Sequence, residues 1–316
     1  MRVFTVLLAL VAASPASAAT DAAAQPGDDF SLAQRTGSVR RPAETVGQLR
    51  ARAEAGDRAA QHDLGIRLLE SRDPAQYAEA RRWFQRASEA GSAEAKNSLA
   101  TLVMYGIGGP ADEAAGRRLM EEAAREGSSG AHLSLAERYL RGMDGYARDP
   151  VRAFEHVRAA AAATGRAGLF GQWRLAMMHL QGLGTPRNPQ EAYRILAAAS
   201  EAGGVNAMIS RAVMLATGEG VPQDPAAARL WYGRAAQSGE HGFEHALRGL
   251  GAMLAAGQGG PVDLPRGIAY LRIAEAAGDR NAAIILQSFS ERVTPQIDEQ
   301  ARRIAAEWMR RHLPTE

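Results

Sequence analysis

Two histidines and a glutamate near residue 243 have a spacing that could hold a metal ion. In His241-Gly-Phe-Glu244-His245 the histidines are four positions apart, which places them one turn apart on a helix. Histidine pairs of this kind bind zinc in hydrolases, where the glutamate acts on the bound water. No downstream acidic ligand is evident in the sequence, and such short motifs arise readily by chance. We therefore expect no metal site and no catalysis here.

Other motifs for catalysis or cofactor binding are incomplete. The chain has glycine-rich turns, but its single lysine, Lys96, falls in a predicted helix and not in a phosphate-binding loop. No predicted strand precedes a glycine-rich turn, and the sequence has no G-x-S-x-G for a serine nucleophile. The sequence thus predicts neither a cofactor nor an enzyme.

The elements that carry these residues belong to a repeat. A glycine that ends an alanine-rich segment recurs every 35 to 39 residues. The positions are Gly56, Gly91, Gly127, Gly165, Gly203, Gly239 and Gly278. A period in this range is typical of solenoids, in which each unit packs only on its neighbours.

Each unit contains the pattern of two helices. The first helix has a small residue at its centre, which lets a neighbouring helix approach closely. These small residues are Gly65, Ala100, Ala136, Ala176, Ala212, Gly251 and Ser288. A turn with two glycines follows, as in Gly182 and Gly184, and the second helix begins at an Asx-Pro pair such as Asn188-Pro189.

These residues resemble the Sel-one-like repeat family, a branch of the tetratricopeptide-repeat superfamily. The run GEGVPQDPAAARLWYGRAAQSG, from Gly218 to Gly239, carries the resemblance most clearly, and the match extends over residues 56–290. It implies an all-α, right-handed α-solenoid of six full helix-turn-helix units and a partial seventh. Three features depart from the pattern: Arg211 replaces a leucine, the first unit has Ser71-Arg72-Asp73 instead of glycines, and Asp144 replaces the second turn glycine of unit three.

The two ends of the chain differ from the repeats. Residues 1–18 combine Arg2, an apolar run and Ala16-Ser17-Ala18, which predicts a signal peptide cleaved after Ala18. Residues 19–45 read as a flexible leader, residues 46–290 as the solenoid and residues 291–316 as a C-terminal capping helix. In the last segment Ile297, Ala301, Ile304 and Trp308 follow a helical stripe.

Composition limits the compartment and the partners. The chain has no cysteine, which excludes both disulfides and a lipid-anchored N-terminal cysteine, and the predicted signal points to the periplasm or to secretion. The 37 basic and 35 acidic residues nearly balance and form no dense basic run, so nucleic-acid binding is not expected. No segment after the signal is apolar enough for a membrane span. The oligomeric state cannot be read from the sequence.

The resemblance implies that the first helices line a concave face. Positions −6, −3, +1 and +4 from the central small residue would face outward, and several of them are large and apolar. We therefore predict a partner-binding patch with arginines at its rim; alternatively, helix packing buries these side chains. The predicted patch is Leu133, Phe170, Trp173, Met177, Ile209 and Val213, and the predicted rim is Arg138 and Arg211.

These observations favour an exported, non-catalytic adaptor that binds a protein or peptide partner on its concave face. The resemblance implies roles in envelope regulation or in polysaccharide export and secretion. Two alternatives remain open at this stage: a cell-envelope hydrolase directed at peptidoglycan or β-lactams, and a carbohydrate-binding solenoid that uses Phe170 and Trp173 as stacking platforms.

Overall fold

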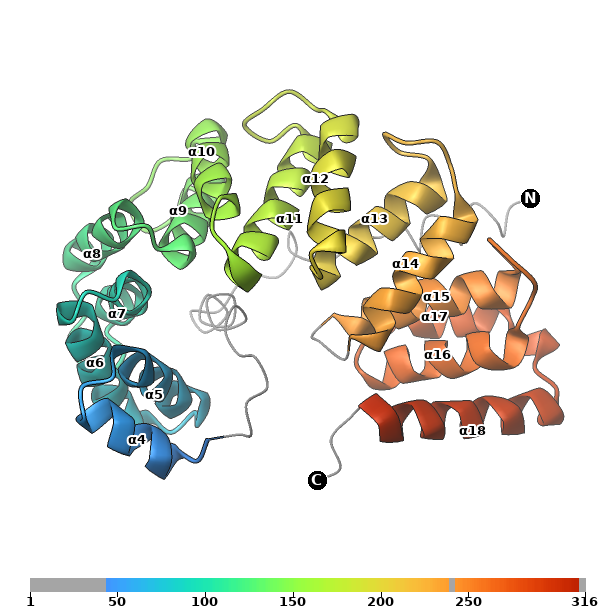
Figure 1. Cartoon of the computed structure of the whole chain (residues 1–316), viewed down its shortest axis with the longest axis horizontal. Helices are drawn as coiled ribbons and strands as arrows, with labels where there is room; N and C mark the ends of the chain where they lie inside the picture. The colour runs from blue at the N-terminus through green and yellow to red at the C-terminus, as the bar shows by residue number, and fades with distance from the viewer. Residues whose placement is uncertain (1–43, 239–241, 313–316) are drawn as a thin grey trace. The chain divides into compact units, whose positions relative to one another are not determined.

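The computed structural model describes residues 44–238 and 242–312, and all regular secondary structure in these ranges is helical (Figure 1). In chain order the helices begin with α4 (Val46–Glu54), α5 (Arg58–Glu70), α6 (Pro74–Glu89), α7 (Ala93–Tyr105), α8 (Glu113–Arg125), α9 (Ser129–Arg141), α10 (Pro150–Ala161) and α11 (Gly165–Gln181). They are followed by α12 (Pro189–Glu201), α13 (Val205–Thr217), α14 (Pro225–Gln237), α15 (Phe243–Ala256), α16 (Leu264–Ala276), α17 (Arg280–Ser288), the short 3₁₀ helix η1 (Ser290–Arg292) and α18 (Pro295–His312).

The helices form consecutive helix-turn-helix repeats. The six full repeats are α5–α6, α7–α8, α9–α10, α11–α12, α13–α14 and α15–α16, and α17 is the first helix of a partial seventh. The predicted all-α solenoid class is therefore confirmed. The predicted signal peptide, the leader up to residue 43, Gly239 and His241 lie outside the described residues. None of the described helices is both long and apolar enough to cross a membrane.

Side-chain caps begin most of the helices. In the second helices of all six repeats, an Asp or Asn at the N-cap accepts a hydrogen bond from a backbone N–H of the first turn, as Asp224 does from Ala227 at 2.9 Å. The first helices of repeats two to six end at a glycine in the left-handed conformation, for example Gly182 with φ 69°, whereas α5 ends at Ser71. The boundaries are thus set by local chemistry that the repeat pattern already contained.

Small residues bring the paired helices into contact. A Cβ on Gly116 of α8 would lie 2.8 Å from the carbonyl oxygen of Ala100 in α7, and one on Gly251 of α15 would lie 2.9 Å from that of Gly267 in α16. Such a distance is too short for any side chain, so the backbones pack directly against each other. Larger side chains such as Phe84 and Leu102, both fully buried, fill the space beside the crossings.

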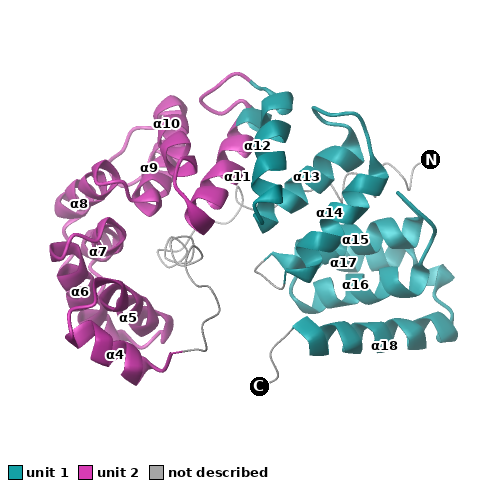
Figure 2. Ribbon diagram, viewed as in Figure 1, with its two compact units in different colours: residues 1–22, 179–181, 187–316 teal, residues 23–178, 182–186 magenta. Residues whose placement is uncertain are grey.

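The chain divides into two compact units, each with its own core (Figure 2). The N-terminal unit contains α4 to α10, α11 up to Met178, and residues 182–186. The C-terminal unit contains residues 179–181 and the described chain from Arg187 onward. In the C-terminal unit Trp308 of α18 is buried and stacks on Phe243 at 5.4 Å, so the predicted capping helix covers the end of the core.

We expect Trp231→Ala in α14 to cost about 3–5 kcal/mol of unfolding free energy, the usual effect of removing a core aromatic side chain. Trp231 is 5% exposed and lies between the guanidinium groups of Arg211 and Arg234, at 4.1 and 4.5 Å from the ring centre. Hydrogen exchange should show lost protection in α13 to α15 and none in α5. Leu230→Ala, at an exposed neighbouring position, is the control, and uniform loss over the whole chain would contradict a solenoid.

Candidate functional site

One turn between paired helices is a residue longer than its counterparts. In the third repeat Gly142, which ends α9, and Asp149, which caps α10, are seven positions apart. In the other glycine turns the matching residues are six positions apart: Gly106 and Asp112, Gly182 and Asn188, Gly218 and Asp224, Gly257 and Asp263. The third repeat therefore carries a one-residue insertion between its helices.

The insertion changes what the turn rests on. In the six-residue turns the second glycine packs on the backbone that starts the preceding second helix, and a Cβ on Gly184 would lie 1.9 Å from the carbonyl oxygen of Pro150. In the third repeat a Cβ on Gly145 would instead meet the guanidinium of Arg117, at 1.7 Å from Nη1. The longer turn thus lies on a side chain and not on backbone, which leaves a space beneath it.

Asp144 holds this turn in place through a buried ion pair. Its backbone is left-handed, with φ 52°, a conformation that aspartate adopts more readily than most residues. Its carboxylate accepts a hydrogen bond from the Tyr105 hydroxyl at 2.7 Å and lies 3.0 Å from Arg138 Nε. The interactions of the carboxylate offset the strain of a non-glycine residue in this region.

Arg138 occupies a position that is apolar in four of the other five repeats and is Arg67 in the first. It lies two residues after the central small residue of α9, where four other repeats place buried Leu102, Met178, Met214 and Met253. Its side chain is 0% exposed and also donates to the Ser134 carbonyl oxygen. The prediction that Arg138 forms a surface rim is wrong, because the residue sits in the core and pairs with Asp144.

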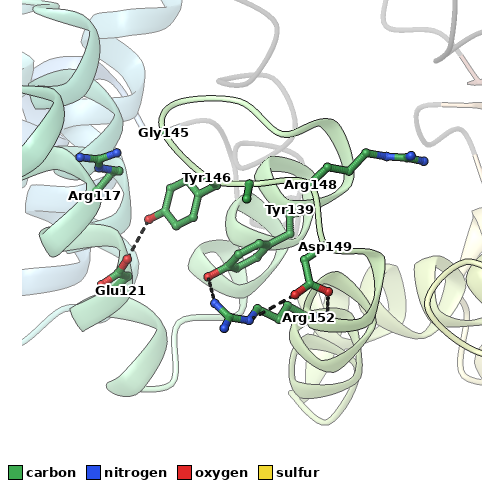
Figure 3. Close-up of a pocket in the computed structure, with 9 residues that line it drawn as sticks. Arg117, Glu121, Tyr139, Gly145, Tyr146, Arg148, Asp149 and Arg152 are labelled. Atoms are coloured by element: carbon green, nitrogen blue, oxygen red, sulfur yellow. Dashed lines mark hydrogen bonds and ion pairs between the residues drawn. The ribbon is translucent and has the colours of Figure 1, made fainter.

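A pocket of about 450 Å³ opens beside the longer turn (Figure 3). It lies wholly within the N-terminal unit, and its lining residues are Arg117, Glu121, Tyr139, Gly145, Tyr146, Ala147, Arg148, Asp149 and Arg152. The Tyr139 and Tyr146 rings meet edge to face, 5.2 Å apart, at the centre of the site. Figure 3 shows Arg117 on the side of Gly145, Arg152 by the hydroxyl of Tyr139, and Arg148 pointing away.

The tyrosines are fixed by hydrogen bonds and by burial. Burial, helped by the nearby Glu121 carboxylate, raises the pKa of Tyr146 well above its ordinary value, so its hydroxyl stays protonated and donates to Glu121 at 3.1 Å. Arg152 lies over the Tyr139 ring at 5.7 Å and within 3.3 Å of Asp149. The pocket therefore presents guanidinium groups around aromatic walls that are already packed.

A histidine pair lies behind the tyrosine wall. His156 stacks on Tyr139 with ring centres 5.6 Å apart, and its Nδ1 lies 3.0 Å from Nδ1 of His132. Burial lowers the pKa of both histidines, and the neighbouring His132 and Arg152 lower that of His156 further. At neutral pH one imidazole donates its Nδ1 proton and the other accepts it.

The predicted apolar patch is only partly exposed. Trp173 is 9% exposed and Ile209 is 4% exposed, while Leu133, Phe170, Met177 and Val213 are half-buried. The expectation that position −3 faces solvent is thus wrong for Trp173 and Ile209. Leu133, Phe170, Trp173 and Met177 belong to the N-terminal unit and Ile209 and Val213 to the C-terminal unit. The role of these six residues in partner binding stays a prediction.

Contacts between consecutive first helices explain the burial of position −3. His62 Nε2 in α5 lies 3.2 Å from the Ser98 hydroxyl in α7, and Arg174 in α11 bonds Glu137 in α9 at 2.9 Å. Side chains from neighbouring repeats therefore meet along the faces that were expected to be open. On the same face Trp173 packs against Phe170, with ring centres 5.2 Å apart, and Ile209 belongs to the core of the C-terminal unit.

Arg211 is also engaged within the protein. Its side chain is largely buried, donates to the hydroxyl of Ser200 at 3.0 Å and pairs with Glu201 at 3.1 Å. Its guanidinium stacks on Trp231. The residue that departs from the repeat pattern at this position thus serves the core of the C-terminal unit.

The second histidine of the zinc-like motif has a carboxylate partner. His245 Nδ1 lies 2.9 Å from Oδ2 of Asp279, the N-cap of α17, and Arg248 pairs with the same carboxylate at 3.0 Å. Burial opposes ionisation of Asp279, but the hydrogen bond from His245 and the charge of Arg248 hold its pKa below the ordinary value. Among the described residues, no group of three or more histidines and carboxylates is placed to hold a metal.

Comparison with known proteins identifies the repeat. The Sel1 repeat model matches residues 58–92, 93–128, 129–164, 169–204, 205–240 and 244–279, more than half of the chain. The chain belongs to the Sel1 repeat family. The predicted membership is confirmed, and Sel1 repeats commonly form scaffolds for protein interaction, typically without catalysis. A comparison with curated proteins found no match.

Solved Sel1 repeat structures share the fold. A protective antigen of uropathogenic Escherichia coli strains with an SLR fold is 27% identical, with a TM-score of 0.60, and the match covers 83% of this chain. The chain spans about half of that protein, 56% of its length. A Sel1 repeat protein from Oxalobacter formigenes is 20% identical with a TM-score of 0.60, over 74% of this chain and 100% of its own.

The repeat pattern in the sequence predicts none of the pocket residues. The sequence signal of the pocket is the extra residue between Gly142 and Asp149, next to the glycine position that Asp144 occupies. An insertion in an otherwise constant Sel1 turn indicates that the turn must leave its usual packing position. Tyr146 lies within that turn, and Arg152 follows it in the first turn of α10.

We expect the buried pair to behave as a unit. Arg138→Met leaves the Asp144 carboxylate without its cation, and Asp144→Gly leaves a buried guanidinium without its anion. Each variant should therefore lose about 3–5 kcal/mol of unfolding free energy. The double variant restores the residue types of the other repeats and should lie within about 1 kcal/mol of the parent. Urea unfolding of the four proteins measures the coupling, and additive losses would contradict it.

The histidine pair should make the N-terminal unit sensitive to acid. Because the folded pKa values of His132 and His156 are lowered, their stabilising contribution is fully present above about pH 6.5 and is lost as the pH falls through the folded values. In the parent, each histidine adds up to about 1.4 kcal/mol per pH unit to the loss of unfolding free energy between pH 7 and 5. Replacing both histidines by glutamine should remove this part of the pH dependence. His62→Gln in the first repeat is the control; an unchanged pH profile in the double variant would oppose this assignment.

Proposed function

We propose that this Sel1 repeat protein is an exported, non-catalytic adaptor that binds a partner protein through its third repeat. The observation that carries the proposal is the pocket beside the longer turn, where exposed guanidinium groups surround a fixed tyrosine pair. The pocket interrupts a fold that is otherwise regular from repeat to repeat. In a family of interaction scaffolds, such a local departure is a natural place for specificity.

The sequence supports export. Residues 1–18 have the features of a cleaved signal peptide, and a chain without cysteine needs no redox control in an oxidising compartment. The Escherichia coli protein that resembles this chain is described as a protective antigen. We place the adaptor in the periplasm or outside the cell, in envelope regulation or in export.

The surroundings of Val151 offer a direct test. This side chain is 60% exposed, lies in the first turn of α10 and is adjacent to Arg152. A photo-crosslinking amino acid at position 151 should form an adduct with a specific envelope protein in the native host. The same amino acid at Val262, 54% exposed beside the six-residue turn of the sixth repeat, should not.

The same cells test the export step. The cross-linked chain should come from the periplasmic or secreted fraction, and its N-terminal sequence should begin Ala19-Thr20-Asp21. A chain found in the cytosol with Met1 intact would refute export. Equal adducts from positions 151 and 262, or no protein adduct from position 151, would refute a binding site in the third repeat.

A further inference from the structure

We propose that the pocket of the third repeat binds a carboxylate group of an extended peptide, with Arg117 and Arg152 as its donors. The carboxylate is a chain end or an acidic side chain of the partner. The inference rests on the proposed function in one respect only, that the peptide belongs to a partner protein.

Hydrogen-bond donors outnumber free acceptors in the pocket. Asp149 accepts from the backbone N–H groups of Val151 and Arg152, at 3.1 and 3.0 Å, because it caps α10. Glu121 accepts from the Tyr146 hydroxyl. The carboxylates of the lining are thus already engaged with protein donors. Each arginine offers five N–H groups in a planar fork, so a ligand rich in acceptors is the one that fits.

The two guanidinium groups are held by contacts of 3.3 Å or more. The side chain of Arg152 is 68% exposed, pairs with Asp149 three positions before it at 3.3 Å and donates to the Tyr139 hydroxyl at 3.5 Å. Arg117 is 34% exposed, pairs with Glu113 at 3.5 Å and donates to the Asp144 carbonyl oxygen at 3.3 Å. Ion pairs between neighbours on an exposed helix surface are weak. A bidentate carboxylate forms a stronger, charge-assisted contact and can replace them.

The charge of the lining favours a single carboxylate over a polyanion. Three arginines of the lining stand against Glu121 and Asp149, and the exposed Glu113 beside Arg117 balances the third positive charge. The site is therefore close to neutral overall. Repeated phosphates need a continuous cationic surface, which this pocket does not have.

The aromatic walls favour a peptide over a sugar. One face of Tyr139 is stacked by His156 at an interplanar angle of 11°, and the guanidinium of Arg152 also lies over its ring. Tyr146 is buried and meets Tyr139 edge to face. A sugar ring that stacks needs an open aromatic face, whereas a peptide end needs donors at the rim and a few hundred Å³ of space. The pocket meets the second requirement.

The test uses synthetic probes and the full mature chain. The probes are acetyl-Ala-Ala-X tripeptides, with X each of the twenty amino acids, as free acids and as C-terminal amides, together with acetyl-Ala-Glu-Ala amide. Side-chain Nε–H signals of Arg117 and Arg152 report binding by NMR. Free acids or the glutamate peptide should shift both signals and bind at least about tenfold more tightly than neutral amides.

Arg152→Gln and Arg117→Gln should each weaken binding by about tenfold or more. Arg266→Gln is the matched control, because Arg266 pairs with the N-cap Asp263 of α16 in the same i, i+3 geometry beside a six-residue turn. Binding by this control should equal that of the parent. Thermal melting of all three variants checks that the exposed substitutions leave the fold intact.

Three results would overturn the inference. One is that no free acid shifts either arginine signal up to roughly 10 mM, well above the affinity range of specific contacts. Another is that acids and amides bind equally. The third is that N-acetylmuramic acid or inorganic phosphate binds more tightly than every peptide, which would assign the pocket to another ligand class. These results are independent of the cross-linking at Val151, so either proposal can fail while the other stands.

Discussion

Backbone atoms of neighbouring helices touch in this protein because glycine and alanine occupy the points where the helices cross. A Cβ on Gly116 would meet the Ala100 carbonyl oxygen, and one on Gly184 would meet that of Pro150. Each repeat therefore fits its neighbour in one register only, and larger side chains fill the space on either side. A chain without disulfides depends on this packing for its whole order.

The same constraint explains why the third repeat differs. An extra residue between Gly142 and Asp149 prevents the turn from resting on backbone, so it rests on Arg117 and a pocket opens. The exposed turn then needs its own anchor, which the buried pair of Arg138 and Asp144 provides. Buried ion pairs add little net stability compared with apolar residues. Their value here is to fix one conformation of the turn.

The pocket is connected to the interior through one aromatic residue. Tyr139 lines the pocket, contacts Arg152 and stacks on His156, which in turn contacts His132. A solenoid tolerates such a local polar network because each repeat contacts only its neighbours, and the other repeats keep their apolar packing. Binding chemistry can thus be placed in one repeat without changing the fold of the rest.

The sequence alone determined the repeat period, the helix pairs, their caps and the terminal helix, because glycine turns, Asx-Pro starts and apolar stripes act within a few residues of one another. It did not determine which side chains are open to a partner. Trp173 is 9% exposed, and Arg138 is fully buried, with its guanidinium 3.6 Å from the Met104 sulfur and 3.4 Å from the Tyr105 hydroxyl, more than thirty positions earlier in the chain. The pocket likewise required the tertiary structure, because a one-residue insertion becomes a cavity only where a neighbouring helix defines the space beneath it.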